Sequence, residues 1–169
     1  MPVTVRPATR ADVPAILEIY NEAVEHTTAS YDLAPVSLDS RLVWFDHKKA
    51  DGWPVLVAED GAGQVAGWAT FGPYRDKAGY NATVEHSVYV RAGGRGAGVG
   101  RTLMGPLIQE ARQRKLHIML GVVDADNAGS IRFHEGFGFE VTGRLPQVGR
   151  KFGRWLDAVF LVLQLEPEA

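Results

Sequence analysis

Hydrophobic positions recur along this chain at two spacings, and each spacing predicts one kind of element. Apolar residues three and four positions apart indicate amphipathic helices. The first helix begins after Thr9, with Asp12 forming a short-armed capping box, and the second is capped by Ser37. A third follows a glycine-rich segment, and a short fourth spans Asn127–Glu135 and ends at Gly136. The apolar faces expected for the first three helices are Val13, Ile16, Leu17, Tyr20 and Val24; Leu38, Leu42 and Phe45; and Leu103, Leu107, Ile108 and Ala111.

Segments rich in β-branched and aromatic residues predict seven strands. Their ranges are 3–6, 55–58, 65–71, 83–90, 118–123, 139–148 and 155–165. A turn at residues 60–63 makes the second and third strands a hairpin, and Gly72-Pro73 is expected to end the third. The resulting order, β-α-α-β-β-β-α-β-α-β-β, predicts a mixed α/β domain and not a regular βαβ repeat. No linker or repeat interrupts it, so residues 1–169 are expected to form a single domain.

Composition and charge narrow the classes of protein. The chain has 169 residues, of which 46% are hydrophobic and 22% charged, as is typical of one globular domain. Its net charge of −2 provides no cationic field, so neither nucleic acid nor a membrane is expected as a partner. The absence of cysteine excludes disulfides, thiolate metal ligands and a cysteine nucleophile. The five histidines show no metal-ligand spacing, so no metal is predicted.

The sequence shows neither a membrane-spanning segment nor a secretory signal. The apolar run at residues 158–163 is too short to span a bilayer, and the first residues lack the apolar stretch of a secretory signal. We therefore expect a cytoplasmic enzyme or binding domain.

The 19 glycines are the unusual feature of the composition, and many lie between Gly93 and Gly100, after a predicted strand and before a helix. Helix N-termini present unbonded N–H groups and a partial positive charge, and glycine lets an anion approach the backbone. The segment therefore predicts an anion site, with a flexible turn as the alternative. Two nucleotide motifs fail here. Arg95 occupies a glycine position of the Walker A pattern, and Val99 or Arg101 occupies the last glycine of the dinucleotide fingerprint.

The pattern that fits is Arg95-x-x-Gly98-x-Gly100 after a strand, which resembles the acyl-CoA pyrophosphate loop of the GNAT superfamily of N-acetyltransferases. A second segment, residues 127–139, resembles that superfamily's Asn-x-x-Ser/Ala…Tyr-Glu-x-x-Gly-Phe stretch, with His134 where many members carry tyrosine. The order of elements is similar over essentially the whole chain. The resemblance implies the GNAT fold, a central mixed and mostly antiparallel sheet flanked by helices, with acetyl-CoA as co-substrate.

Within the superfamily the chain most resembles the phosphinothricin and methionine sulfoximine (methionine sulfone) N-acetyltransferases. The segments that carry this likeness are Ile-Tyr-Asn at 19–21, Thr-Val-Glu-His-Ser-Val-Tyr-Val at 83–90 and Pro-Gln-Val-Gly-Arg-Lys-Phe-Gly-Arg-Trp at 146–155. The likeness implies N-acetylation of a small amino-acid-like amine. It also implies a homodimer, for which Lys151, Phe152 and Trp155 are candidate contacts.

The resemblance implies three groups of contacts with acetyl-CoA. Backbone N–H groups of the glycine loop cradle the phosphates, and Arg95 and Arg101 add charge, unless they are ordinary surface arginines. The pantetheine arm follows the fourth predicted strand, where an N–H, expected from Val88, polarises the thioester carbonyl. Asn127 contacts the pantetheine, although a helix N-cap is the ordinary alternative. The implied cofactor residues are Val88, Tyr89, Val90, Arg95, Gly96, Ala97, Gly98, Val99, Gly100, Arg101, Asn127 and Ser130.

Two residues are candidates for proton transfer. Glu85 lies on a mostly apolar strand, where a carboxylate must be ion-paired, solvated or functional. It is the candidate base. A salt bridge or an exposed strand face is the alternative. His134 is the candidate acid for the departing thiolate because it occupies the family's tyrosine position, and a histidine that only packs or caps is the alternative. His86 points to the other face of the strand and is expected to be structural.

The acceptor is expected to contact the loop after the third strand. Arg75 can hold a carboxylate in two parallel hydrogen bonds, which suits an amino-acid substrate. The resemblance adds the backbone of residues 85–87 and Tyr31 as a wall of the pocket. The expected acceptor residues are Tyr31, Tyr74, Arg75, Asp76, Lys77, Glu85, His86 and Ser87.

Three functions stay open on the sequence. The leading one is acetyl-CoA-dependent N-acetylation of a small amino-acid-like substrate in a ternary complex, because without cysteine no acetyl-cysteine intermediate can form. A non-catalytic CoA-binding or sensor domain would keep the glycine loop but would not need Glu85 with Arg75. A protein or peptide N-acetyltransferase usually has an open, often acidic groove, which Arg75 and Lys77 argue against.

Overall fold

The computed structural model describes residues 2–166, and the elements follow one another in the predicted order. The strands are β1 (Thr4–Pro7), β2 (Val55–Glu59), β3 (Val65–Pro73), β4 (Thr83–Val90), β5 (Ile118–Asp124), β6 (Glu140–Lys151) and β7 (Arg154–Gln164). The helices are α1 (Val13–His26), α2 (Leu38–Ala50), α3 (Val99–Gln113) and α4 (Ala128–Glu135). The predicted mixed α/β fold is confirmed.

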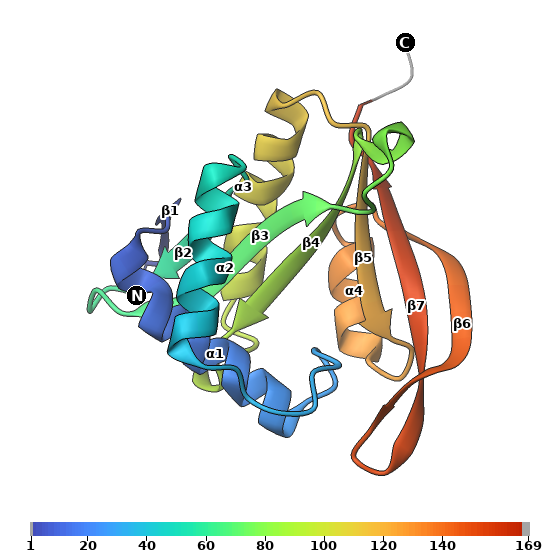
Figure 1. Cartoon of the computed structure of the whole chain (residues 1–169), viewed down its shortest axis with the longest axis horizontal. Coiled ribbons are helices and arrows are strands. Elements are labelled where there is room, and N and C mark those ends of the chain that lie inside the picture. Colours follow the sequence, from blue (N-terminus) through green and yellow to red (C-terminus); the bar gives the residue numbers. More distant parts are fainter. Residues whose placement is uncertain (1, 167–169) are drawn as a thin grey trace.

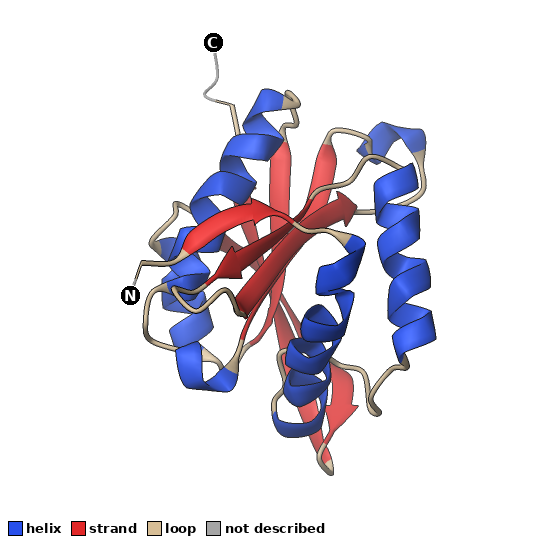
Figure 2. Cartoon of the chain, turned by 90° about the vertical axis from the view of Figure 1, so that its left-hand side faces the viewer, coloured by secondary structure: helices blue, strands red, loops and turns tan. Residues whose placement is uncertain are grey.

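Within the described residues the strands form one seven-stranded sheet in the order β1-β2-β3-β4-β5-β7-β6. All neighbours are antiparallel except β4 and β5, which are parallel. Helices cover both faces of the sheet (Figure 2). Since side chains alternate along a strand, each face has its own core. Val57 and Trp68 pack on the side of α1 and α2, and Phe71 and Met119 pack on the side of α3.

The start of α1 follows the predicted capping pattern. A single 3₁₀ turn, Arg10–Asp12, precedes the helix, and the Asp12 carboxylate accepts the Thr9 N–H at 2.7 Å. The same carboxylate accepts from the Arg6 guanidinium at 2.8 Å, which ties the helix start to β1. This charge-assisted pair lowers the pKa of Asp12. The local pattern and the tertiary contact therefore fix the same helix start.

Three details of the predicted elements are wrong. Strand β3 continues through Pro73, which pairs with Val84, instead of ending at Phe71. Strand β6 extends to Lys151, because the turn to β7 consists of residues 152–153, whose φ angles of 52° and 74° suit the twist of a two-residue hairpin. In α2, Leu38 is 42% exposed, and the helix buries Arg41 instead, over the rings of Tyr20 and Trp44.

The parallel pair β4–β5 is short and then opens. Its register covers only Thr83–Ile118, Val84–Met119 and Glu85–Leu120. Beyond Glu85 the two strands diverge, as Figure 1 shows for the ends nearer α1 and α4. A split between adjacent strands leaves backbone groups and both sheet faces accessible from the gap. The split positions the candidate site.

Candidate active site

A cavity of about 870 Å³ lies where β4 and β5 separate. Its walls are β4 from Glu85 onward, the glycine loop with the start of α3, the first turns of α4, and the loop between α1 and α2. The predicted site residues that line it are Tyr31, Glu85, His86, Ser87, Val88, Tyr89, Val90, Arg95, Gly96, Gly98, Val99, Gly100, Arg101, Asn127, Ser130 and His134. The structure brings together both candidate catalytic residues and every predicted cofactor residue except Ala97.

The glycine loop ends in the N-terminus of α3. Gly96 and Gly98 have φ angles of 82° and 86°, a left-handed conformation that glycine adopts without strain. The Thr102 N–H donates to the Gly98 carbonyl at 3.0 Å and closes the first helical turn. The N–H groups of residues 99–101 therefore point out of the helix end. Together with the helix dipole they form an anion site that fits a phosphate group.

The two arginines predicted beside this loop have different surroundings. The Arg95 guanidinium pairs with the Glu22 carboxylate of α1 at 2.8 Å. The Arg101 guanidinium lies 5.8 Å from the centroid of the Phe137 ring. Both line the cavity, so each can contribute a charge-assisted hydrogen bond to a phosphate there. Arg95 would have to share or exchange its carboxylate partner to do so.

Strand β4 directs backbone groups into the split. The Arg91 N–H donates to the Ala66 carbonyl at 2.9 Å, and the Thr83 carbonyl accepts from the Tyr74 N–H at 3.3 Å. The backbone N–H and C=O groups of the odd-numbered residues of β4 therefore point toward β3. The backbone N–H and C=O groups of the even-numbered residues point toward β5. Val88 is one of these and lies past the last pair with β5. Its N–H therefore points toward the gap, as expected for a donor to an oxyanion.

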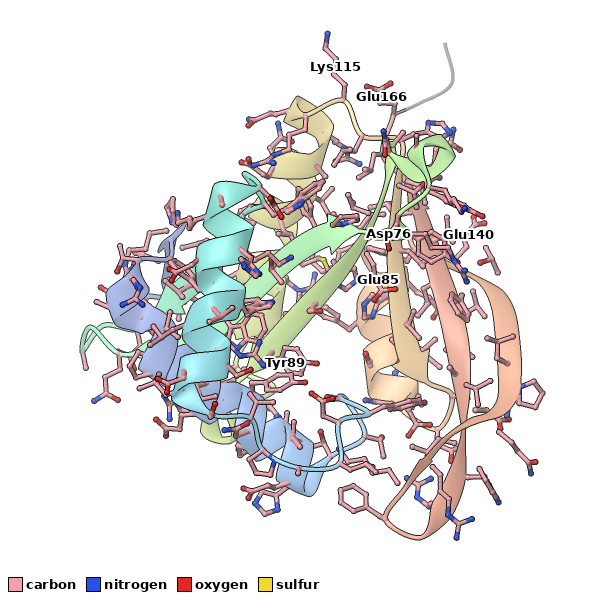
Figure 3. The ribbon with its side chains drawn as sticks, in the orientation of Figure 1. Asp76, Glu85, Tyr89, Lys115, Glu140 and Glu166 are labelled. Atoms are coloured by element: carbon pink, nitrogen blue, oxygen red, sulfur yellow. The ribbon has the colours of Figure 1, made fainter. Side chains whose placement is uncertain are left out.

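Glu85 is the last residue of β4 that pairs with β5, and its register partner on β3 is Gly72. Figure 3 shows Glu85 near the angle between β4 and β5, with Tyr89 farther along β4 toward α1. The carboxylate is accessible from the cavity, yet the surrounding protein partly desolvates it and raises its pKa. Burial is the only cause of this shift, so no ion pair within residues 2–166 holds the carboxylate. An isolated carboxylate with a raised pKa is suited to general base catalysis.

His134 and His86 form a pair below the split. His134 is 5% exposed, its Nδ1 lies 2.7 Å from the Ser130 carbonyl, and its Nε2 lies 3.1 Å from Nε2 of His86. Burial lowers the pKa of both rings, that of His86 to about 3. At neutral pH both imidazoles are therefore neutral. The carbonyl can only accept, so the proton of His134 is on Nδ1 and points into its own helix. This geometry favours packing and capping for His134 over the predicted role as acid.

The loop between α1 and α2 closes one side of the cavity. The Tyr89 hydroxyl donates to the Ala29 carbonyl at 3.4 Å, and the Thr28 hydroxyl donates to the buried Asp124 carboxylate at the end of β5 at 2.5 Å. The Lys151 ammonium, also buried, donates to the Ser30 carbonyl at 2.7 Å. These bonds hold the backbone of residues 28–30 against three strands.

Lys151 is therefore an internal contact, in contrast to the predicted surface contact between subunits. Phe152 and Trp155 are each 56% exposed and keep the accessibility that such a contact needs.

The predicted acceptor loop, residues 74–77, does not line the cavity. Arg75 is exposed and packs over the Tyr74 ring at 5.2 Å. The loop nevertheless begins one residue after Pro73, whose partner on β4 is Val84, next to Glu85. Figure 3 shows Asp76 at the end of the sheet near Glu85. The structure thus puts this loop at the rim and not in the wall.

Several wall residues were not predicted from the sequence. They are Ala23, Thr27, Thr28, Ala29, Ser30, Gly94, Val122, Val123, Asp124, Gly129 and Phe133. Asp124 carried a usable signal, since a polar residue at the carboxyl end of a buried strand often faces a site. The small and polar residues 27–30 carried none, because their composition is that of any loop.

Comparison with known proteins places the chain in a family. The model of the Acetyltransferase (GNAT) family matches residues 14–139. The chain belongs to the GNAT acetyltransferase family. An L-methionine sulfoximine/L-methionine sulfone acetyltransferase of Pseudomonas aeruginosa is 49% identical over 167 residues, covering 99% of this chain and 97% of the relative. The predicted N-acetyltransferase activity and the predicted GNAT fold are confirmed at this level.

Two solved GNAT structures superpose closely on this one. A ribosomal-protein-alanine N-acetyltransferase from Brucella melitensis has a TM-score of 0.93 at 49% identity, covering 95% of this chain and 99% of that one. A phosphinothricin acetyltransferase from Sinorhizobium meliloti, in complex with acetyl-CoA, has a TM-score of 0.94 at 34% identity, covering 97% and 89%.

Residues 2–166 contain neither a candidate metal site nor a candidate membrane span. No cluster of three or more His, Asp or Glu side chains is arranged to hold a metal ion. No helix there has the length and apolar character needed to cross a membrane.

Proposed function

We propose that this GNAT acetyltransferase transfers the acetyl group of acetyl-CoA to the amino group of a small amino-acid-like acceptor of the methionine sulfoximine, methionine sulfone or phosphinothricin type. The observation that carries the proposal is one continuous cavity that joins the N-terminus of α3 to Glu85 along the split of β4. One end suits phosphate, and the other holds an isolated carboxylate. The name of the Pseudomonas relative supports the acceptor class.

The chain offers suitable contacts for each part of acetyl-CoA. The N–H groups of residues 99–101 would hold the pyrophosphate, with Arg101 and Arg95 beside them. Asn127 accepts the Ser130 N–H at 3.0 Å through its side-chain oxygen, which leaves its amide NH₂ as a donor to the pantetheine. The Val88 N–H would polarise the thioester carbonyl, a contact of the kind whose loss costs ~3 kcal/mol of barrier.

Glu85 would serve as the base, directly or through water. An α-ammonium group must lose a proton before it can attack, and a carboxylate with a raised pKa accepts that proton more readily. A C–N bond then forms, the C–S bond breaks, the attacking nitrogen releases its second proton to solvent as the amide forms, and CoA leaves as a thiolate. Because a thiol has a pKa of about 8.5, the thiolate can take its proton from solvent, so His134 need not supply it.

The acceptor's carboxylate remains assigned to Arg75 at the rim. Its loop adjoins the start of β4 and hence Glu85, and a guanidinium fits a carboxylate in two parallel bonds. A homodimer is part of the same proposal. The exposed apolar side chains of the β6–β7 hairpin that suit such an interface are Leu145, Val148, Phe152 and Trp155.

The test is thiol release from acetyl-CoA with methionine sulfoximine, methionine sulfone and phosphinothricin. Glu85→Gln should lower kcat about 100-fold while acetyl-CoA affinity, measured by calorimetry, is unchanged. Glu140→Gln, an exposed glutamate on β6, is the matched control and should keep full turnover. Binding of acetyl-CoA without turnover of any amine would instead indicate a non-catalytic CoA-binding domain.

A second acceptor class has one observation in its favour. The Brucella structure, also 49% identical, is named for acetylation of a protein alanine. A peptide with N-terminal alanine therefore belongs in the same assay. Turnover of the peptide at a higher kcat/KM than any of the three small amino acids would replace the proposed acceptor class, whereas the assignment of Glu85 would stand.

A further inference from the structure

The buried pair of histidines joins two walls of the cavity that lie far apart in sequence. His86 is on β4, one residue past the last pair with β5, and His134 is on α4. Their ring centroids lie 5.0 Å apart with the planes at 29°, and both rings pack edge-on against Phe139. The contact between their Nε2 atoms is therefore held in place by packing on several sides.

The protons of the pair can be assigned from its partners. The Ser130 carbonyl accepts a proton from Nδ1 of His134, so Nε2 of that neutral ring is bare. A contact of 3.1 Å between two nitrogens is favourable only if one carries a proton, so Nε2–H of His86 is the donor. Nδ1 of neutral His86 is then also bare. This agrees with its being buried without a hydrogen-bond partner among the described residues.

These contacts belong to one series of hydrogen bonds. His86 donates to His134, and His134 donates to the Ser130 carbonyl in the first turn of α4. The Ser130 N–H in turn donates to the side-chain oxygen of Asn127 at 3.0 Å. Asn127, Ser130, His134 and His86 all line the cavity. The series thus links the split strand to the side chain that presents its amide NH₂ to the cavity.

We infer that His86 is a positioning residue for acetyl-CoA, acting through His134 and Ser130 to fix the separation of β4 from α4 and the orientation of Asn127. This inference rests on the proposed function, because it assumes that acetyl-CoA occupies the cavity. In this role His134 orients Asn127 and does not have to donate a proton to the departing thiolate. His86 acts from the face of β4 opposite to Glu85.

Three substitutions separate the hydrogen bond from the volume of the ring. His86→Phe keeps an aromatic ring but removes the donor, and it should raise the dissociation constant of acetyl-CoA about tenfold, the equivalent of one buried hydrogen bond. His86→Gln restores an N–H donor of similar reach and should recover most of that affinity. His47→Phe, at an exposed position of α2, is the matched control and should bind as the wild type does.

Kinetics and spectroscopy distinguish positioning from a general loss of stability. In His86→Phe the KM for acetyl-CoA should rise while kcat at saturating acetyl-CoA is kept, whereas partial unfolding would lower kcat alone. In ¹⁵N spectra of the wild-type protein, His134 should carry its proton on Nδ1 and His86 on Nε2. In His86→Phe the Ser130 carbonyl still holds the His134 proton on Nδ1, whereas Nε2 of His134 loses its donor, so the ¹⁵N resonance of that Nε2 should shift toward the value of an unbonded imidazole nitrogen.

The inference is overturned if His134 is protonated on Nε2 in the wild type. It is equally overturned if His86→Phe, shown to be folded by circular dichroism, binds acetyl-CoA as tightly as the wild type. Calorimetry and the ¹⁵N spectra need no acceptor turnover. A failure of the proposed acetylation with the expected affinity change would therefore count against the acceptor assignment and leave the role of His86 intact.

Discussion

The crowding around Gly121 of β5 gives a prediction with a calculable size. A Cβ at this position would lie 2.8 Å from Nε2 of His86 and 3.2 Å from Nε2 of His134. Both rings are buried and packed against Phe139, so neither tip can move without disturbing its neighbours. Gly121→Ala should therefore force an extra methyl group into a filled space.

The expected loss of stability follows from two opposing effects. Overpacking a core lowers the free energy of unfolding by ~1–3 kcal/mol. Replacing glycine by alanine raises it by ~0.4–1 kcal/mol, because alanine restricts the conformations of the unfolded chain. The net loss in the free energy of unfolding is therefore about 1–2 kcal/mol. For a chain of 169 residues this corresponds to a fall in Tm of about 3–6 °C.

Thermal unfolding followed by circular dichroism measures this change. Gly129→Ala is the matched control, because it is exposed in α4 and its new Cβ would meet only Asn127 Oδ1, at 3.7 Å. It should raise the Tm slightly, since alanine favours helix. The double variant Gly121→Ala/His86→Ala should be more stable than the sum of its parts by about 1 kcal/mol, because the 2.8 Å contact is gone. An unchanged or higher Tm in Gly121→Ala, with the control behaving as stated, would refute the crowding argument.

Three further predictions concern a charge in the site, the cation at the glycine loop and a helix cap. Because burial raises the pKa of Glu85, the ionised carboxylate destabilises the folded state, and stability is lost as the pH rises through the folded-state pKa. Glu85→Gln should therefore be more stable than the wild type to urea at pH 8 and equally stable near pH 4. The reverse order would contradict the raised pKa of Glu85. Glu22→Gln releases Arg95 and should tighten acetyl-CoA binding by about twofold to fivefold at low salt in calorimetry, an effect that must shrink as salt is added. Ser37→Ala removes the acceptor for the Ser40 N–H at the start of α2 and should cost about 1 kcal/mol in chemical denaturation, with no change in acetyl-CoA affinity.

The sequence predicted the elements because their causes are local. The spacing of apolar residues, the caps at Thr9 and Ser37 and the glycine loop each depend on a few neighbouring residues. The phosphate end of the cavity was predictable for the same reason, since one strand, one loop and one helix N-terminus build it. The ends of β3 and β6 were misjudged because strand length depends on the partner strand as well as on the segment itself.

The acceptor end could not be predicted to the same depth. The loop between α1 and α2, which closes one side of the cavity, is held by Asp124 and Lys151, which follow it by about a hundred residues, so nothing within the loop itself marks it as a wall. Arg75 has a side chain suited to a carboxylate, but only the tertiary structure reveals that its loop does not line the cavity.

His134 and His86 illustrate the division most clearly. The sequence alone placed His86 on the opposite strand face from Glu85, because side chains alternate along a strand. Only the tertiary structure decided that His86 meets His134, 48 residues away, and that this contact occupies the nitrogen an acid would need. Element type and face follow from local periodicity, whereas the position and protonation of a ring depend on which distant groups pack around it.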